Sequence, residues 1–334
     1  MPTPDLIRAR HVGACVEHQR SLGRSVYSQL DRAGIPPECL ENPAGVLPTS
    51  YFARFLSSAC SASELSAFSY QAAPEGLAAY PELQRQIGAS KNLIDLFAGF
   101  SVGASEVSGL RFRLGAWERK IWIYATSTSA CLKDLGWSSY LVRPMIEIAR
   151  AATGSTWWPE TVRLPSAHTV QMESLDLPPA VNVELRSNRA AVEIPGHVLF
   201  QPIDRQRPPR PRYLPPGADD EDRELPAHLT GAVRLLLKTY MGKRPLPISE
   251  LASLADCSVR SLQRELREAG CSFSSLLQDV RYLSSVPLLM HSSTSITELA
   301  YELGYSDPAH FSRAFQRVSG TSPSAFRRLN NAPA

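Results

Sequence analysis

A duplicated layout in the last third of the chain constrains the fold more than any other feature of the sequence. One copy begins Ile248-Ser-Glu-Leu-Ala-Ser-Leu-Ala255, and the other begins Ile296-Thr-Glu-Leu-Ala-Tyr-Glu-Leu303, 48 residues later. In both copies the Ile-x-x-Leu-Ala spacing places three apolar side chains on one face of a short helix, and the small alanine lets a second helix approach closely. The layout therefore predicts two helix-turn-helix units.

The residues after each short helix carry signals for a tight turn and a new helix. Gly304 can adopt the left-handed conformation at the end of the first helix in the second unit. Ser258 and Asp307 are suitable N-caps for the helices that follow, and Pro308 stands at the first helical position. Both units are thus predicted to turn sharply between their helices.

The second helix of each unit has a divided surface. The residues expected inside are Val259, Leu262 and Leu266 in the first unit, and Phe311, Ala314 and Phe315 in the second. The residues expected outside are Arg260, Gln263, Arg264 and Arg267, and then Ala309, His310, Ser312 and Arg313. One such helix alone is typical of an ordinary charged surface. Two copies favour a pair of recognition helices, whose Arg, Gln and Ser side chains reach base edges and phosphates.

The charge of the chain is uneven. Residues 223–334 contain 13 basic and 9 acidic residues, a net +4, which leaves −1 for the rest of a chain whose formal charge is +3. This asymmetry favours a polyanionic partner for the C-terminal part. The hydrophobic content of 43% excludes whole-chain disorder.

Proline marks the boundary between two regions. Residues 202–222 contain six prolines, and proline lacks a backbone N–H and restricts φ, so neither a helix nor a central strand can run through them. An extended linker is favoured over a proline-rich loop packed on one domain. The predicted organisation is an α+β domain over residues 1–201, a linker over residues 202–222, and an all-α domain with two helix-turn-helix units over residues 223–334.

Periodicity predicts the elements of both domains. In the first, helices are expected over residues 12–30, after Pro48, near Ser63, and over residues 93–100 and 138–152. Two strand pairs are also expected there, over residues 110–114 with 120–125, joined around Gly115-Ala116, and over residues 181–185 with 190–194, turning at Ser187-Asn188. In the second, helices are expected over residues 229–240, 248–255, 259–268, 274–282, 296–303 and 309–318.

Residues from about Thr230 to Arg328 resemble the DNA-binding domain of the AraC/XylS family of bacterial transcription regulators. The most specific segments are Ile296 to Phe315 (ITELAYELGYSDPAHFSRAF) and Gly320 to Arg327 (GTSPSAFR), and Ser258 to Arg264 agrees with them. The resemblance implies two units, joined by a long helix, that enter successive major grooves of double-stranded promoter DNA. It also implies base or backbone contacts from Arg260, Gln263, Arg264, Ala309, His310, Ser312 and Arg313.

The joining helix departs from the family's pattern, which is usually rich in Leu and Ala and free of proline. Here it carries Pro287, with Ser284 and Ser285 just before it. Proline inside a helix costs about 3 kcal/mol and kinks it. Pro287 is therefore expected either to bend the joint between the units or to begin a separate final helical turn.

Residues 1–201 resemble, more loosely, the ligand-binding and dimerisation domain that precedes some AraC-type DNA-binding domains. The similar segments are Ala33 to Pro37, Leu47-Pro48 and Gly154 to Leu164. This resemblance implies an effector site or a dimer surface. Four tryptophans either line an apolar effector pocket or belong to the core of a half-buried sheet; they are Trp117, Trp122, Trp157 and Trp158.

No catalytic or metal arrangement stands out. His11, Cys15 and His18 could present three metal ligands on one helix face, but scattered polar and core positions are favoured because no second ligand cluster supports them. Ser105 with Glu106, His168 and His197 form no recognisable catalytic arrangement. We therefore expect no catalytic centre, no metal and no cofactor.

These observations favour a one-component, sequence-specific transcription regulator over an enzyme. Besides promoter DNA, the candidate partners are RNA polymerase, a small-molecule effector and a second copy of the chain. Two alternatives stay open: an N-terminal protein-interaction domain without a small ligand, and an enzyme fused to a DNA-binding domain. The scattered cysteines, the lack of a secretory signal and the lack of a membrane-spanning run predict a cytoplasmic protein with reduced thiols.

Overall fold

The computed structural model describes residues 3–42, 44–59, 87–102, 110–127, 135–154, 156–165, 177–187, 189–203, 225–226 and 228–330. Its contacts divide the chain into two compact units. The sheet unit comprises Asp5–Ile35 and Thr49–Leu225, and the helical unit comprises Met1–Pro4, Pro36–Pro48 and Pro226–Ala334. The predicted fold class, an α+β region followed by an all-α region, is confirmed. The linker over residues 202–222 stays a prediction, since most of it lies outside the described residues.

Within the described residues, the helices of the sheet unit are α1 (Ala9–Ser21), α2 (Tyr27–Ala33), α3 (Thr49–Ala59), α6 (Leu93–Val102), α7 (Leu135–Thr153) and α8 (Gly196–Leu199). The single helix predicted over residues 12–30 is wrong, because α1 ends before Gly23. That glycine has φ +74°, a left-handed conformation that stops a helix. Helix α3 buries Phe52, Phe55 and Leu56 as predicted. The helix predicted near Ser63 lies outside the described residues.

The strands of the sheet unit are β1 (Leu6–Arg8), β3 (Leu110–Trp117), β4 (Lys120–Ser127), β5 (Thr161–Pro165), β6 (Asn182–Ser187) and β7 (Ala191–Ile194). Five of them form one sheet in the order β3-β4-β7-β5-β6. The first predicted hairpin is present, but its turn lies at Glu118-Arg119, with φ values of 54° and 62°. Gly115 instead pairs with Trp122 inside the hairpin, where a Cβ would lie 2.8 Å from the Trp117 ring. This glycine therefore serves close ring packing, not the turn.

The second predicted hairpin is wrong. Strand β5 lies between β6 and β7 and pairs with both. Val162 of β5 is the partner of Val183 in the parallel ladder with β6, and of Val192 in the antiparallel ladder with β7. Two short strands joined by a few residues resemble a hairpin locally, whereas the insertion of a third strand between them depends on pairing over long sequence distances.

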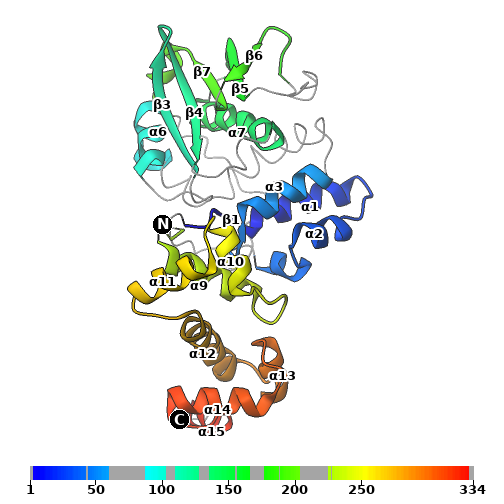
Figure 1. The fold of residues 1–334 in the computed structure, drawn as a ribbon. Helices are drawn as coiled ribbons and strands as arrows, with labels where there is room; N and C mark the ends of the chain where they lie inside the picture. Colours follow the sequence, from blue (N-terminus) through cyan, green and yellow to red (C-terminus); the bar gives the residue numbers. More distant parts are fainter. Residues whose placement is uncertain are drawn as a thin grey trace. The chain divides into compact units, whose positions relative to one another are not determined.

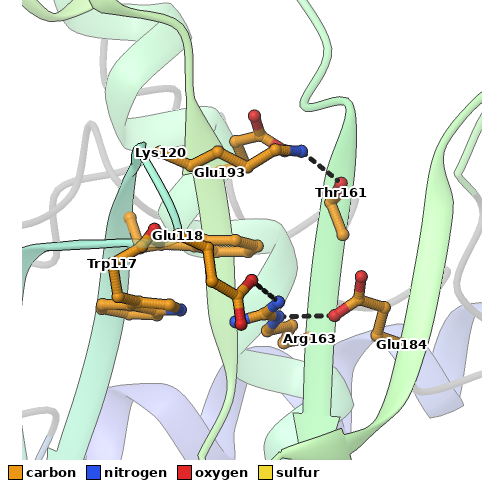
Figure 2. A network of polar contacts seen from close by, with 8 residues as sticks. Trp117, Glu118, Lys120, Thr161, Arg163, Glu184 and Glu193 are labelled. Atoms are coloured by element: carbon orange, nitrogen blue, oxygen red, sulfur yellow. Dashed lines mark hydrogen bonds and ion pairs between the residues drawn. The ribbon is translucent and has the colours of Figure 1, made fainter.

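Residues along these strands alternate between two different faces of the sheet. The apolar face carries the buried residues Ile123, Val162 and Val192, and α6 and α7 contact the strands of this sheet (Figure 1). The opposite face carries charged and aromatic side chains. There Lys120 Nζ donates to Glu193 Oε2 at 2.8 Å (Figure 2). The sheet thus has one face for the core and one polar face.

The helical unit contains η1 (Pro37–Glu41), β2 (Val46–Pro48), α9 (Leu229–Tyr240), α10 (Ile248–Leu254), α11 (Val259–Glu268), α12 (Phe273–His291), α13 (Ile296–Glu302), α14 (Pro308–Ser319) and α15 (Pro323–Asn330). All the helices predicted here are present, and the one predicted over residues 274–282 is the first half of α12. Helix α15 was not predicted. Helix α12 contacts α9, α14 and α15 and so lies at the centre of this unit. In the part of the chain that the structure describes, no helix is both long and apolar enough to cross a membrane.

Residues 36–48 belong to the helical unit, although the predicted domain bounds place them in the first domain. The Val46 N–H donates to Thr239 Oγ1 at 3.0 Å. The Cys39 thiol lies 3.7 Å from the Thr239 carbonyl oxygen, to which it donates. Burial raises the pKa of Cys39 to about 11, so the thiol keeps its proton. This segment is therefore attached to α9, while its sequence neighbours on both sides belong to the sheet unit.

Candidate nucleic-acid interface

The two helix-turn-helix units share one turn geometry. The Cys257 N–H donates to the Ala252 carbonyl, and the Tyr305 N–H donates to the Ala300 carbonyl, both at 2.9 Å. The residue before each donor is left-handed: Asp256 has φ +49°, and Gly304 has φ +72°. A bond of this span around a left-handed residue is the Schellman arrangement at a helix end. The repeat seen in the sequence is thus also a repeat of the backbone.

The second helix of each unit is capped as predicted. Ser258 Oγ accepts the Ser261 N–H at 3.1 Å at the start of α11. Asp307 Oδ1 accepts the Ala309 N–H at 2.9 Å at the start of α14. Each cap supplies an acceptor to an N–H that has no partner within its helix. The caps fix where the second helix of each unit begins and therefore which residues occupy its first turn.

Helix α11 packs through one face and leaves the other open. Leu262 and Leu266 are fully buried. The predicted contact residues Arg260, Gln263 and Arg264 are all exposed. Because they occupy the first two turns of a capped helix, they form one surface of cationic and amide groups. Such groups can donate to the acceptor edges of guanine and adenine or to phosphates.

Helix α14 has the same organisation. Phe311 and Phe315 are buried in a cluster with residues of α12 and α13, and their ring centres lie 5.9 Å apart. Three of the four predicted contact residues are exposed, namely Ala309, His310 and Arg313. The buried aromatic cluster anchors one face of this helix, and its first turns stay accessible on the other face.

Ser312 differs from the other predicted contact residues. It is half-buried, and its Oγ donates to the Pro308 carbonyl at 3.0 Å. The hydroxyl hydrogen is thus used inside the helix, while the oxygen can still accept a bond.

Two of the exposed arginines, Arg264 and Arg313, are held by weak surface ion pairs. Arg264 Nε lies 3.7 Å from Glu268 Oε1, and Arg313 Nη2 lies 3.8 Å from Asp307 Oδ2. The arginine side chains are 62% and 66% exposed. Exposed pairs of this kind contribute about 0–1 kcal/mol, so a phosphate or a base edge can replace either carboxylate at little cost.

The joining helix is continuous. Pro287 lies inside α12, so the interpretation that it begins a separate final turn is wrong. Proline has no N–H to donate to the Leu283 carbonyl. Leu283 is exposed, so water can supply the missing hydrogen bond on that side of the helix.

Two residues that support the second unit were not singled out from the sequence. Arg281 of α12 donates to the carbonyl oxygens of Leu303 and Gly304. Gly242 lies against the backbone of Glu302. The sequence carries no signal for either contact, because each joins residues more than 20 positions apart. In the sequence, Arg281 is only one of the basic residues that give the domain its net charge.

Three tryptophans of the sheet unit have described ring contacts, at two places. At the first, Trp117 and Trp122 are stacked with ring centres 5.1 Å apart, and Trp122 is fully buried. The Arg163 guanidinium lies 4.3 Å from the Trp122 ring centre and is held by Glu118 and Glu184 (Figure 2). Trp122 is therefore buried, as the interpretation as a core residue requires, but it lies on the polar face of the sheet, beneath Arg163.

The second place lies beside α7. The Trp158 ring lies 4.9 Å from the guanidinium of Arg143 and 4.7 Å from that of Arg150. Glu147 pairs with both arginines at 3.0 Å. The effector pocket stays a prediction, and these charged groups around Trp158 show that its surroundings are not purely apolar.

The helix face proposed for metal ligation is largely buried. Cys15 is fully covered, and burial, together with the charges of Arg10 and Arg8, lowers the pKa of His11 to about 3. Within the described residues, no group of three His, Cys, Asp or Glu side chains could hold a metal ion.

Residues 251–329 match a family model described as a helix-turn-helix domain. Over 87 residues the chain is 41% identical to the HTH-type transcriptional regulator GlxA of Rhizobium meliloti (strain 1021), covering 26% of this chain and 27% of GlxA. Over 90 residues it is 33% identical to the HTH-type transcriptional activator RhaR of Escherichia coli (strain K12), covering 27% of this chain and 32% of RhaR. The chain thus spans less than a third of the length of these curated relatives. Among solved structures, the transcriptional regulator CdpR from Pseudomonas aeruginosa aligns over 91% of this chain and 96% of its own, at 17% identity and a TM-score of 0.35.

Proposed function

We propose, from the premise that residues 251–329 match a helix-turn-helix domain, that this chain is a sequence-specific transcription regulator of the AraC type. In this proposal α11 and α14 enter two major grooves of double-stranded promoter DNA. The residues proposed to contact bases or phosphates are Arg260, Gln263, Arg264, Ala309, His310, Ser312 and Arg313.

The observation that carries the proposal is the repeated geometry of the two units. Each has the same left-handed turn, a capped second helix, and an exposed first turn above a buried apolar face. An ordinary charged helix surface needs neither the repeat nor the capped start. A protein that reads two half-sites needs both, because each recognition helix must present its N-terminal residues to base edges in a defined orientation.

Charge supports the same function. The net +4 of residues 223–334 provides the sequence-independent attraction to phosphates. The weak ion pairs of Arg264 and Arg313 leave both guanidinium groups available for exchange onto DNA. GlxA is a transcriptional regulator and RhaR a transcriptional activator, which agrees with this proposal and gives no support to the alternative of a fused enzyme.

A binding experiment tests the proposal directly. The full chain is used to select sites from a pool of random duplexes, and its affinity for the selected site is then measured against salt concentration. If about four phosphates are neutralised, a fourfold rise in salt should lower the affinity by about a hundredfold. Failure to enrich any sequence would contradict sequence-specific recognition.

A matched pair of variants separates the interface from general charge. Arg260→Ala removes an exposed cation from α11, and Arg32→Ala removes an exposed cation from α2 in the sheet unit. We expect only Arg260→Ala to weaken binding, by about tenfold or more. Equal losses in both variants would mean that the net charge alone, and not α11, carries the binding.

The sheet unit is proposed to control DNA binding by taking a small-molecule effector or by dimerising. Its half-exposed Trp117 and the charged groups around Arg163 offer polar and aromatic contacts on one face of the sheet. A thermal-shift screen against metabolites, read by tryptophan fluorescence, and sedimentation of the full chain test the two routes. A stabilising metabolite supports an effector, and a protein-interaction domain without a small ligand predicts no shift. RNA polymerase contact is a further proposal, which transcription from the selected site with purified polymerase would test.

A further inference from the structure

We propose that Arg281 and Gly242 are positioning residues that hold the two helix-turn-helix units at one fixed separation, and so set the base-pair spacing accepted between the two half-sites. This inference rests on the proposed function and extends it to residues outside α11 and α14. We call the group formed by Gly242, Arg281 and residues 302–305 the junction.

Arg281, on α12, clamps the turn of the second unit. Its Nε donates to the Leu303 carbonyl oxygen at 3.0 Å, and its Nη2 donates to the Gly304 carbonyl oxygen. Its guanidinium carbon lies 4.3 Å from the centre of the Tyr305 ring. The end of α13 leaves carbonyl groups without helical donors, and a cation is favourable there. The planar fork of arginine is suited to donating to two acceptors while stacking on a ring.

Gly242 brings the first unit into contact with the end of α13 in the second unit. It lies in the connection between α9 and α10, and its φ is +69°. A Cβ on this residue would lie 2.0 Å from the Glu302 carbonyl oxygen and 2.8 Å from the Glu302 carbonyl carbon. Both atoms belong to the backbone, so they cannot move aside as the end of a flexible side chain would. The connection before α10 therefore presses directly on the last residue of α13.

Tyr305 connects the junction to α14, because its ring packs against residues of that helix. Its ring is buried, and its centre lies 5.6 Å from the His310 ring and 5.5 Å from the Phe311 ring. His310 is one of the proposed DNA contacts, and Phe311 anchors α14 in the core. A shift of Arg281 would thus move Tyr305 and, with it, the first turn of α14.

The junction gives the two units a second connection besides α12. Two recognition helices held rigidly read half-sites about one helical turn, roughly 34 Å, apart on one face of the duplex. If only α12 joined the units, α14 could adjust to half-sites at other spacings. With the junction closed, a change of spacing must instead be met by deforming the DNA, which is costly.

The test uses two variants of the full chain, each with a matched control. Gly242→Ala introduces the clash with Glu302, and its control is Gly270→Ala. Gly270 has φ +77°, and its Cβ would meet nothing within 4 Å, so that variant has similar backbone strain without the contact. Arg281→Gln removes the clamp, and its control is Arg328→Gln, which removes the same charge from an exposed position on α15.

The probe is the duplex that wild-type protein selects from a random pool about 30 base pairs long, enough for two half-sites one turn apart. It is remade with one or two base pairs inserted or removed between the half-sites. We expect a two-base-pair insertion to lower wild-type and control affinity about tenfold, and to lower that of Gly242→Ala and Arg281→Gln less than about threefold.

Identical spacing profiles for wild type and both variants would overturn the inference while leaving the proposed function intact. If the wild type selects no sequence, the proposed function itself has failed, so the two failures are distinguishable. Circular dichroism shows whether each variant folds. If Gly242→Ala does not, the profile of Arg281→Gln decides the matter alone.

Discussion

Replacing Gly304 by alanine tests the left-handed turn of the second helix-turn-helix unit. Gly304 has φ +72°, a conformation that costs a residue with a Cβ about 1–2 kcal/mol. The substitution also restricts the unfolded chain, which returns about 0.4–1 kcal/mol. The added Cβ would lie 3.3 Å from Arg281 Nη2, which donates to the Gly304 carbonyl oxygen, so the Arg281 side chain must shift slightly to accept the methyl group. We expect the free energy of unfolding of the helical unit to fall by about 1 kcal/mol.

The first unit supplies the reverse experiment, because Asp256 occupies the same position with φ +49°. In Asp256→Gly the two free-energy terms change sign. We expect the free energy of unfolding of the helical unit to rise by no more than about 0.5 kcal/mol, since aspartate tolerates the left-handed region better than most residues.

Urea unfolding followed by far-UV circular dichroism measures both variants. The five tryptophans all lie between residues 117 and 158, so their fluorescence reports the sheet unit and should show an unchanged transition. Our account of the turn would be refuted by a Gly304→Ala variant as stable as the wild type, or by a change confined to the fluorescence transition.

Four further predictions concern the DNA-binding fragment, two arginines, Pro287 and His11. A fragment of residues 223–334 should bind DNA with an affinity that falls steeply with salt, and a folded fragment without such affinity would contradict the placement of the interface. If Arg264 or Arg313 reads a guanine, its replacement by alanine should weaken the binding free energy by about 1–3 kcal/mol and relax the preference at one base pair. If the arginine instead holds a phosphate, binding to all sequences should weaken evenly, and competition binding distinguishes the two cases. Wild-type affinity in both variants would contradict their placement at the interface. Pro287→Ala should stiffen α12, slightly raise helicity and alter the tolerance to insertions between half-sites, and an unchanged spacing profile would place Pro287 outside the mechanical joint. Because its pKa is lowered to about 3 in the folded chain, His11 should reduce the free energy of unfolding by about 1.4 kcal/mol per pH unit as pH falls below about 6.5, and His11→Leu should remove that slope in acid urea titrations.

The helical unit was largely predictable because its signals are local. Apolar spacing, an N-cap such as Ser258 and a glycine such as Gly304 act within one or two helical turns, so they specify a helix and its ends before any tertiary contact forms. The faces of α11 and α14 followed from the same periodicity. Helix α15 was missed although Pro323 stands at its start.

The sheet unit was predicted less well because strand pairing joins distant residues. The spacing of residues 181–194 suggests a hairpin, and only the fold shows β5 between the two strands. Gly115 looked like a turn residue, whereas the turn lies at Glu118-Arg119 and the glycine makes room for the Trp117 ring. In each case the local pattern permits more than one arrangement, and side-chain packing across strands chooses among them.

The sequence by itself determined that two capped helices would each present a row of exposed polar and cationic side chains, since periodicity and capping depend only on near neighbours. The tertiary structure alone decided what holds those helices in relation to one another. The clamp of Arg281 on the turn after α13, the close approach of Gly242 to Glu302, and the attachment of residues 36–48 to α9 all join segments far apart in the chain. Such contacts form only after loops of 20 to 200 residues have closed, and no pattern of neighbouring side chains encodes which distant backbone a glycine or an arginine will meet.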